Sequence, residues 1–205
     1  MSEAIPAAGA LDEETARAEL YDLLAQLYYG PPATELFEAL TATATQAGAA
    51  GALLEKPWRD LLGKAREMPR DAVASEYEAL FGGIGKPEIY LFGSHYLSGF
   101  LNDRPLAQLR ADLARLGLAR VEAMSETEDH ISYLCEVMRY LITGDDAAVA
   151  NLMTQREFFA AHLQSWVPAF CDALAAHPLA RFYAALAAFT QAFMKVEAQG
   201  FDMLA

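Results

Sequence analysis

Residues 178–197 read PLARFYAALAAFTQAFMKVE and show the clearest helical repeat in the chain. Apolar side chains recur at Leu179, Phe182, Tyr183, Leu186, Phe189, Phe193 and Val196. Their spacing of three or four positions places them on one face of a helix of about five turns. Pro178 suits the first position of this helix, where the N–H that proline lacks would be unpaired in any case. The stretch therefore predicts a long amphipathic helix packed on a core.

The same spacing recurs upstream. Three further apolar stripes consist of Leu20, Leu23, Leu24 and Leu27; of Leu106, Leu109, Leu113 and Leu116; and of Ile131, Leu134, Cys135, Met138, Leu141 and Ile142. No stretch alternates with period two, the pattern of a half-buried strand. We therefore predict an all-α fold, in which residues 11–205 form a single compact, bundle-like domain of about eight to ten helices. Residues 1–10 are expected to be a mobile tail.

Glycine and proline mark the expected ends of the helices. Breaks are predicted at 30–32, at 82–87, at Gly117 and at 144–146, where these residues interrupt the apolar patterns. Pro168 lies inside an apolar helical pattern, and a proline there removes one backbone donor and clashes with the preceding turn. That helix should kink or divide.

Composition and charge exclude several classes of protein. The chain has 205 residues, of which 54% are hydrophobic and 21% charged, so disorder is excluded. Fifteen Lys and Arg against 28 Asp and Glu give a net charge of -13. This charge repels a phosphate backbone, and we expect no nucleic-acid partner. It favours a basic peptide or a cationic ligand, although acidic residues also simply keep proteins in solution.

The cysteines, the first residues and the longest uncharged stretch indicate in which cellular compartment the protein works. Cys135 and Cys171 are far apart and each lies in an apolar helical pattern, so neither a disulfide framework nor a zinc site is indicated. The first residues lack the pattern of a secretory signal. The longest uncharged stretch, 39–54, is shorter than the ~20 residues that span a bilayer. We expect a cytoplasmic protein without membrane insertion.

Two segments lack the pattern of an ordinary amphipathic helix. The first comprises residues 76–97. Its glycine-rich centre, 82–87, lies between flanks that carry Tyr77, Phe81, Tyr90, Phe92 and Tyr96. These rings predict a packed loop rather than a solvated one, because large aromatic groups favour burial. Core packing and a binding groove both remain open, and the abundance of tyrosine favours a groove edge. The glycines do not match a phosphate-binding loop.

The second segment, residues 125–130, reads Ser-Glu-Thr-Glu-Asp-His. Ser125 and Glu128 have the spacing of a capping box, which predicts a helix start at Ser125 with acidic residues in its first turn. This leaves Asp129 and His130 without a structural duty, so their replacement should affect binding rather than folding. No Lys or Arg occurs from 121 to 138 to balance the acids. The segment is expected to be a docking point for guanidinium groups.

The sequence contains no pattern typical of a metal site or a catalytic site. No Glu-x-x-His pattern occurs near any histidine, which argues against a di-iron bundle. Ser94 and His95 are only sequence neighbours, and no nucleophile-elbow pattern appears. We expect no metal, no cofactor and no catalytic residue. The alternatives are a helical carboxylate- or nucleotide-dependent hydrolase that uses the acidic cluster at 126–130 with Mg²⁺, and a scaffold that binds another protein's helix.

Taken together, the motifs resemble the TorD/DmsD family of cytoplasmic chaperones for molybdenum oxidoreductases. The motifs are Tyr77 with Leu80-Phe81, a glycine-containing loop, Phe92-Gly93-Ser94-x-Tyr96-Leu97, Leu116-Gly117-Leu118, and Glu126-x-Glu128-Asp129-His130 before an apolar helix. The resemblance runs from about residue 20 to 197. Thr127 stands where many members have proline, and Phe92 where some have tryptophan.

The resemblance implies a binding protein rather than an enzyme. Its partners would be the twin-arginine leader and the apo form of a molybdopterin oxidoreductase catalytic subunit, held until the molybdenum cofactor is inserted and export is licensed. The chain could be a monomer or a dimer. The implied leader-binding residues are Asp129, His130, Glu126, Tyr77, Leu80, Phe81, Phe92, Ser94 and Tyr96. Such a leader would need carboxylates beside an aromatic groove, which segments 76–97 and 125–130 would supply if they meet.

Overall fold

The computed structural model describes residues 8–43, 51–82, 86–121 and 124–203, and these residues form an all-α structure, as predicted. The helices are α1 (Ala8–Tyr29), α2 (Thr34–Ala42), α3 (Gly51–Glu67), α4 (Arg70–Phe81), α5 (Gly93–Ser98), α6 (Arg104–Arg115), α7 (Ile131–Thr143), α8 (Leu152–Phe159), α9 (Val167–Ala176) and α10 (Phe182–Asp202). A π-helical turn, Ala160–Gln164, follows α8 directly. Residues 1–7 of the expected tail lie outside the described ranges, and α1 begins at Ala8.

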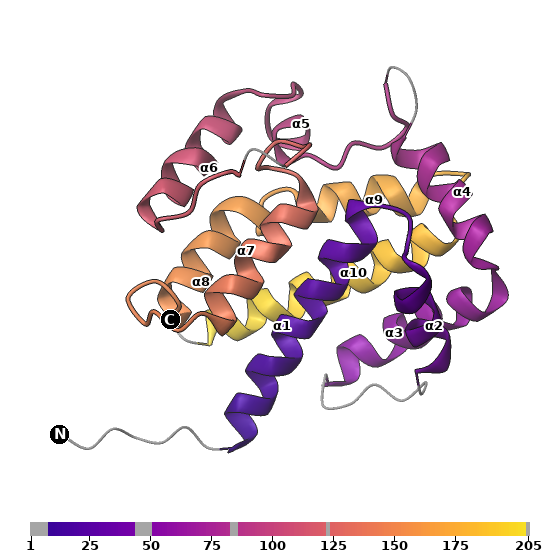
Figure 1. Ribbon diagram of the computed structural model, residues 1–205, viewed down its shortest axis with the longest axis horizontal. Helices are drawn as coiled ribbons and strands as arrows, with labels where there is room; N and C mark the ends of the chain where they lie inside the picture. The colour runs from indigo at the N-terminus through magenta and orange to yellow at the C-terminus, as the bar shows by residue number, and fades with distance from the viewer. Residues whose placement is uncertain (1–7, 44–50, 83–85, 122–123, 204–205) are drawn as a thin grey trace.

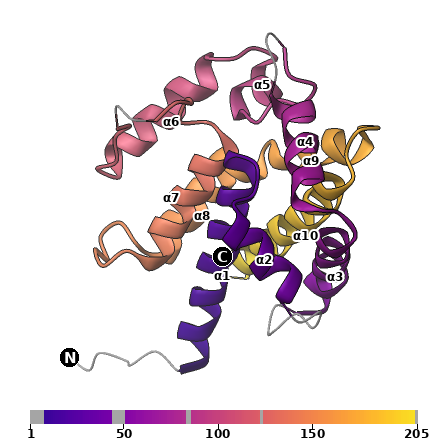
Figure 2. The same ribbon diagram turned by 45° about the vertical axis from the view of Figure 1, so that its right-hand side comes forward.

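The long helices make the centre of the bundle. Helix α1 packs along α7, while α10 packs against α3 and α9 (Figure 1). Helices α5 and α6 lie together at one edge, beyond α7 and α8, and α2, α3 and α4 lie at another (Figures 1 and 2). Within the described ranges, no helix combines the length and the apolar character that crossing a membrane requires.

Aromatic side chains fill the core between these helices. Tyr21 of α1 meets Phe193 of α10 edge to face, with 4.9 Å between ring centroids, and Tyr28 meets Phe170 of α9 at 5.3 Å. The hydroxyl groups of both tyrosines are satisfied inside the core. Tyr21 donates to Glu197 at 3.0 Å, and Tyr28 bonds to the Thr190 hydroxyl at 2.9 Å. The core therefore joins α1, α9 and α10 by ring packing and by buried hydrogen bonds.

The predicted stripe on α10 is buried except at its start and at Val196, which is half-buried. Phe182 is fully buried, but Leu179 is 51% exposed. The helix begins at Phe182, so the prediction that Pro178 occupies its first position is wrong. A carboxylate from α4 sets the start instead. Glu76 accepts hydrogen bonds from the backbone N–H groups of Arg181, Phe182 and Tyr183 at 2.8, 3.2 and 2.8 Å, which are donors that a helix start leaves unpaired.

The predicted breaks separate helices where the structure describes them. Residues 30–32 lie between α1 and α2, and Gly144 follows α7. Gly117 follows α6 with a φ of 71°, a left-handed conformation that glycine adopts without strain. The break at 82–87 begins directly after α4, and its residues 83–85 lie outside the described ranges.

The helix around Pro168 divides, as its position predicts. The π-helical turn ends at Gln164, and α9 starts at Val167 with Pro168 in its first turn. Trp166 lies at the junction, is almost fully buried, and donates its indole N–H to the backbone carbonyl of His162 at 2.6 Å. The proline therefore begins a new helix, where its missing N–H costs nothing.

We expect Glu76→Gln to destabilise the fold. The carboxamide places an N–H₂ group against a backbone N–H of α10, so a buried donor loses its acceptor, at a cost of ~1–3 kcal/mol in the free energy of unfolding. Glu78→Gln is the matched control, because Glu78 is on the same helix but exposed; it should change stability by less than ~0.5 kcal/mol. Urea unfolding followed by circular dichroism measures both, and equal stability of the two variants would contradict this role.

Candidate functional site

The two segments singled out in the sequence meet at one pocket. Its volume is about 270 Å³. It is lined by Tyr29, Tyr77, Phe81, Leu91, Phe92, Ser125, Glu126 and His130. These residues come from the end of α1, from α4, from the connection between α4 and α5, and from the loop before α7. The pocket thus combines aromatic walls with a carboxylate and an imidazole.

Backbone hydrogen bonds hold the two segments together. Phe92 and His130 form an isolated antiparallel bridge. On one side of it, the N–H of Ile131 donates to the carbonyl of Leu91 at 2.9 Å; on the other, the N–H of Gly93 donates to the carbonyl of Asp129 at 3.0 Å. The connection before α5 and the loop before α7 are therefore fixed in register, which also fixes the side chains that each contributes to the pocket.

Asp129 is buried behind the pocket and has a structural role. Only 3% of the residue is exposed. Its Oδ2 accepts the N–H of Ser94 at 2.9 Å, and its Oδ1 accepts the hydroxyl of Thr127 at 2.6 Å. The carboxylate therefore satisfies a backbone donor in the first turn of α5. The premise that Asp129 has no structural duty is wrong, because this contact with α5 is not visible in the local sequence.

His130 is the N-cap of α7, so the predicted helix start at Ser125 is also wrong. The helix begins at Ile131, and Nδ1 of His130 accepts the N–H of Ser132 at 3.2 Å. The ring meets Phe92 edge to face at 5.1 Å. Burial lowers the pKa of His130 to about 4, so its imidazole is neutral at pH 7. His130 therefore positions the pocket and carries no charge for a ligand.

Glu128 already has a cationic partner. Arg110 of α6 binds its two oxygens at 3.0 and 2.9 Å, and this hydrogen-bonded pair lowers the pKa of Glu128. The expectation of an unbalanced acidic patch is therefore wrong for Glu128, since its partner comes from outside 121–138. Glu126 differs from both other acids. It lines the pocket, and within the described ranges no Lys, Arg or His nitrogen approaches it within 4.0 Å.

The walls of the pocket are aromatic rings in different environments. Tyr29 is 53% exposed at the end of α1. Tyr77 donates its hydroxyl to the carbonyl of Tyr28 at 3.1 Å, and its ring lies 5.0 Å from that of Phe81. A planar cation can stack on such rings while a carboxylate binds its N–H groups in a fork. The arrangement therefore suits a guanidinium group better than an anion.

Five of the nine residues predicted for the site line the pocket: Tyr77, Phe81, Phe92, Glu126 and His130. The others support it from behind. Leu80 lies in the core, Ser94 binds Asp129, and Tyr96 stacks on Trp166 at 5.5 Å.

Sequence reasoning did not identify Tyr29 and Leu91 as lining residues. Tyr29 falls outside the leucine stripe of α1 and comes directly before the break at 30–32, which could have marked it as an exposed aromatic residue. Leu91 lies inside the aromatic segment 76–97 but carries no signal of its own.

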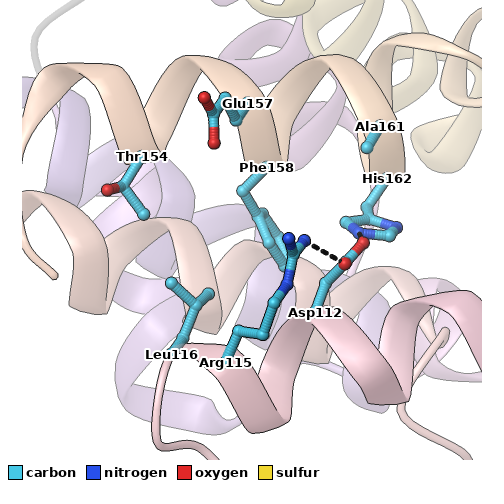
Figure 3. Close-up of a pocket in the computed structure, with 8 residues that line it drawn as sticks. All are labelled: Asp112, Arg115, Leu116, Thr154, Glu157, Phe158, Ala161 and His162. Atoms are coloured by element: carbon cyan, nitrogen blue, oxygen red, sulfur yellow. Dashed lines mark hydrogen bonds and ion pairs between the residues drawn. The ribbon is translucent and has the colours of Figure 1, made fainter.

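A second pocket, of about 330 Å³, lies between α6 and the α8–π-turn segment (Figure 3). Asp112 of α6 pairs there with Arg115 and with Nε2 of His162, at 2.8 Å for the histidine (Figure 3). The hydrogen bond between Asp112 and His162 thus joins α6 to the neighbouring segment. Across the described ranges, no three His, Cys, Asp or Glu side chains converge as metal ligands. The hydrolase alternative lacks its carboxylate cluster, because Glu128 and Asp129 are bound within the protein.

The buried histidine predicts a specific pH dependence of stability. Between its usual pKa of about 6.5 and about 4, His130 takes up a proton only in the unfolded chain, so stability falls as pH falls. From pH 7 to 4.5 the loss is about 2 to 3 kcal/mol. His130→Asn keeps a capping acceptor but does not titrate, so it should lack this part of the loss. Urea unfolding of both proteins at both pH values measures the difference, and identical losses would show that His130 does not contribute.

The sequence is similar to those of known proteins. The family model described as nitrate reductase delta subunit matches residues 46–172. The chaperone protein TorD of Photobacterium profundum is 27% identical over 143 residues, which are 66% of each chain. The chaperone protein TorD of Aliivibrio fischeri is 26% identical over 142 residues, which are 65% of this chain and 66% of the relative.

The similarity covers only part of each curated relative, but the family model covers enough of the chain to assign the family. The chain spans 66% of the length of these two curated relatives, just under two thirds. Both relatives are named as chaperones, and the resemblance to the TorD/DmsD family seen in the motifs is confirmed. Since the family model covers more than half of the chain, the protein belongs to the nitrate reductase delta subunit family.

Proposed function

We propose that this protein is a cytoplasmic chaperone, and not an enzyme, that assists the maturation of a molybdenum oxidoreductase. It binds the twin-arginine leader of the apo catalytic subunit until the molybdenum cofactor is inserted. The names of the curated relatives support the chaperone role. The observation that carries the leader-binding role is the pocket in which Glu126, a carboxylate without an ion-pair partner among the described residues, lies among aromatic rings.

The chemistry of the pocket fits an arginine side chain. Glu126 accepts two parallel N–H groups of the guanidinium, while the rings of Tyr29, Tyr77, Phe81 and Phe92 offer faces and edges to its planar cation. Arginine is more weakly hydrated than lysine, so it enters such a pocket at a lower desolvation cost. The net charge of -13 adds a long-range attraction for a basic peptide.

Asp129 and His130 serve this function by holding the pocket in shape and not by contacting the leader. Asp129 holds the first turn of α5, and His130 caps α7 beside Phe92. Their removal should therefore weaken binding through loss of the pocket's shape, together with loss of stability. Replacement of Glu126 or Tyr29 should weaken binding while the fold is retained, because Glu126 is only half-buried and Tyr29 is 53% exposed.

Isothermal titration with a synthetic leader peptide tests the proposal. A peptide with two adjacent arginines and a following apolar run should bind at micromolar strength or better, about -8 kcal/mol. Replacing both arginines by lysines should weaken binding, because an ammonium group lacks the forked geometry. Added salt should weaken it only in part, since contacts with the apolar run are not screened. Equal affinity for the lysine peptide would contradict recognition by the pocket.

The matched variants are Tyr29→Ala and Tyr140→Ala. Tyr29 lines the pocket, whereas Tyr140 is a comparably exposed tyrosine near the end of α7, outside the pocket. The first substitution should weaken binding by ~1–2 kcal/mol, the value of a partly desolvated cation–π contact. The second should leave the affinity unchanged. Equal effects of the two variants would place the leader elsewhere.

A further inference from the structure

Two adjacent arginines cannot share one small pocket. Consecutive side chains of an extended peptide point to opposite faces, so the guanidinium groups of the two arginines point in opposite directions. The pocket of about 270 Å³ is below the usual range for a drug-sized ligand, and it suits one large side chain. If the leader places one arginine in the pocket, the other needs an acceptor outside it.

We propose that Glu78 is this second acceptor: Glu126 binds one arginine inside the pocket, and Glu78 binds the other at the rim, beside the end of α4 at Gly82. This inference rests on the proposed function and adds to it a residue that specifies a pair of arginines rather than a single one. It concerns a position to which no motif of the sequence assigned a role.

The placement of Glu78 follows from helix α4. Tyr77 and Phe81 are one turn apart and both line the pocket, and Glu78 is the next residue around the helix from Tyr77. Its carboxylate lies over the end of the helix. A Cβ built at Gly82 would lie 2.5 Å from Oε2 of Glu78, so the absence of a side chain at Gly82 leaves room for the carboxylate beside Phe81.

The negative charges of Glu78 and Glu126 both act on the Tyr77 phenol. Burial raises the pKa of the Tyr77 phenol most, and the negative charges of Glu78 and Glu126 raise it further. Glu78 is exposed, and within the described ranges it has no ion-pair partner within 4.0 Å. The remaining acid nearby on α4, Glu76, is buried and holds the start of α10. Glu78 is therefore the carboxylate of α4 that remains available at the rim.

Double-mutant cycles between protein and peptide test the pairing. The protein variants are Glu78→Gln and Glu126→Gln, and the peptides replace either the first or the second arginine of the leader by glutamine. Each carboxylate should couple to one arginine, and the two carboxylates should couple to different arginines. Where a carboxylate and an arginine bind each other, replacing both should weaken binding no more than the larger of the two single replacements, about tenfold. Where they do not, the affinity losses of the two single replacements should multiply.

Glu19→Gln is the matched control, because Glu19 is exposed on α1, about three turns before Tyr29, and its loss changes the net charge equally. If the wild type binds the leader but Glu78→Gln behaves like Glu19→Gln, the second acceptor is wrong and the proposed function stands. Coupling of both carboxylates to the same arginine would also overturn it. If the wild type does not bind the two-arginine peptide, the proposed function fails, and the role of Glu78 fails with it.

Discussion

The hydrogen bond from the Ser94 N–H to the buried Asp129 carboxylate joins the parts of the molecule on which the pocket depends. Beside it, the bridge between Phe92 and His130 places one pocket ring directly against the cap of α7. Helix α7 in turn packs along α1, which carries Tyr29 at its end. A short acidic segment thus fixes α5 against α7, α7 packs along α1, and these two contacts together set the walls of the pocket.

The fold class was predictable because apolar periodicity reports directly on helix faces. The stripes of α6 and α7 are largely buried, and glycine and proline separated the helices as expected. The errors concern helix starts. Residue Glu76 fixes the start of α10 from a position 106 residues before Phe182, and the bridge with Phe92 moves the start of α7 beyond Ser125. Both effects come from tertiary contacts, which override local capping signals.

The site was predictable in its segments but not in the roles of its residues. The aromatic and acidic segments do meet, yet the acids divide between functions that their types alone do not reveal. Asp129 binds the backbone of α5, Glu128 binds Arg110, and Glu126 faces the pocket. Which carboxylate remains open to a ligand depends on burial and on partners distant in sequence. The most motif-like residues, Asp129 and His130, are both buried, at 3% exposure each, so a strong sequence signature here marks the framework of the site.

The central claim is that the signature residues position the pocket while Glu126 and the aromatic rings contact the ligand. A crystal structure of the protein with a two-arginine leader peptide tests it most directly. The account predicts one guanidinium within hydrogen-bond distance of Glu126 and stacked on a pocket ring, with Asp129 still bound to the Ser94 N–H. A structure in which Asp129 has left Ser94 and binds an arginine itself would contradict it.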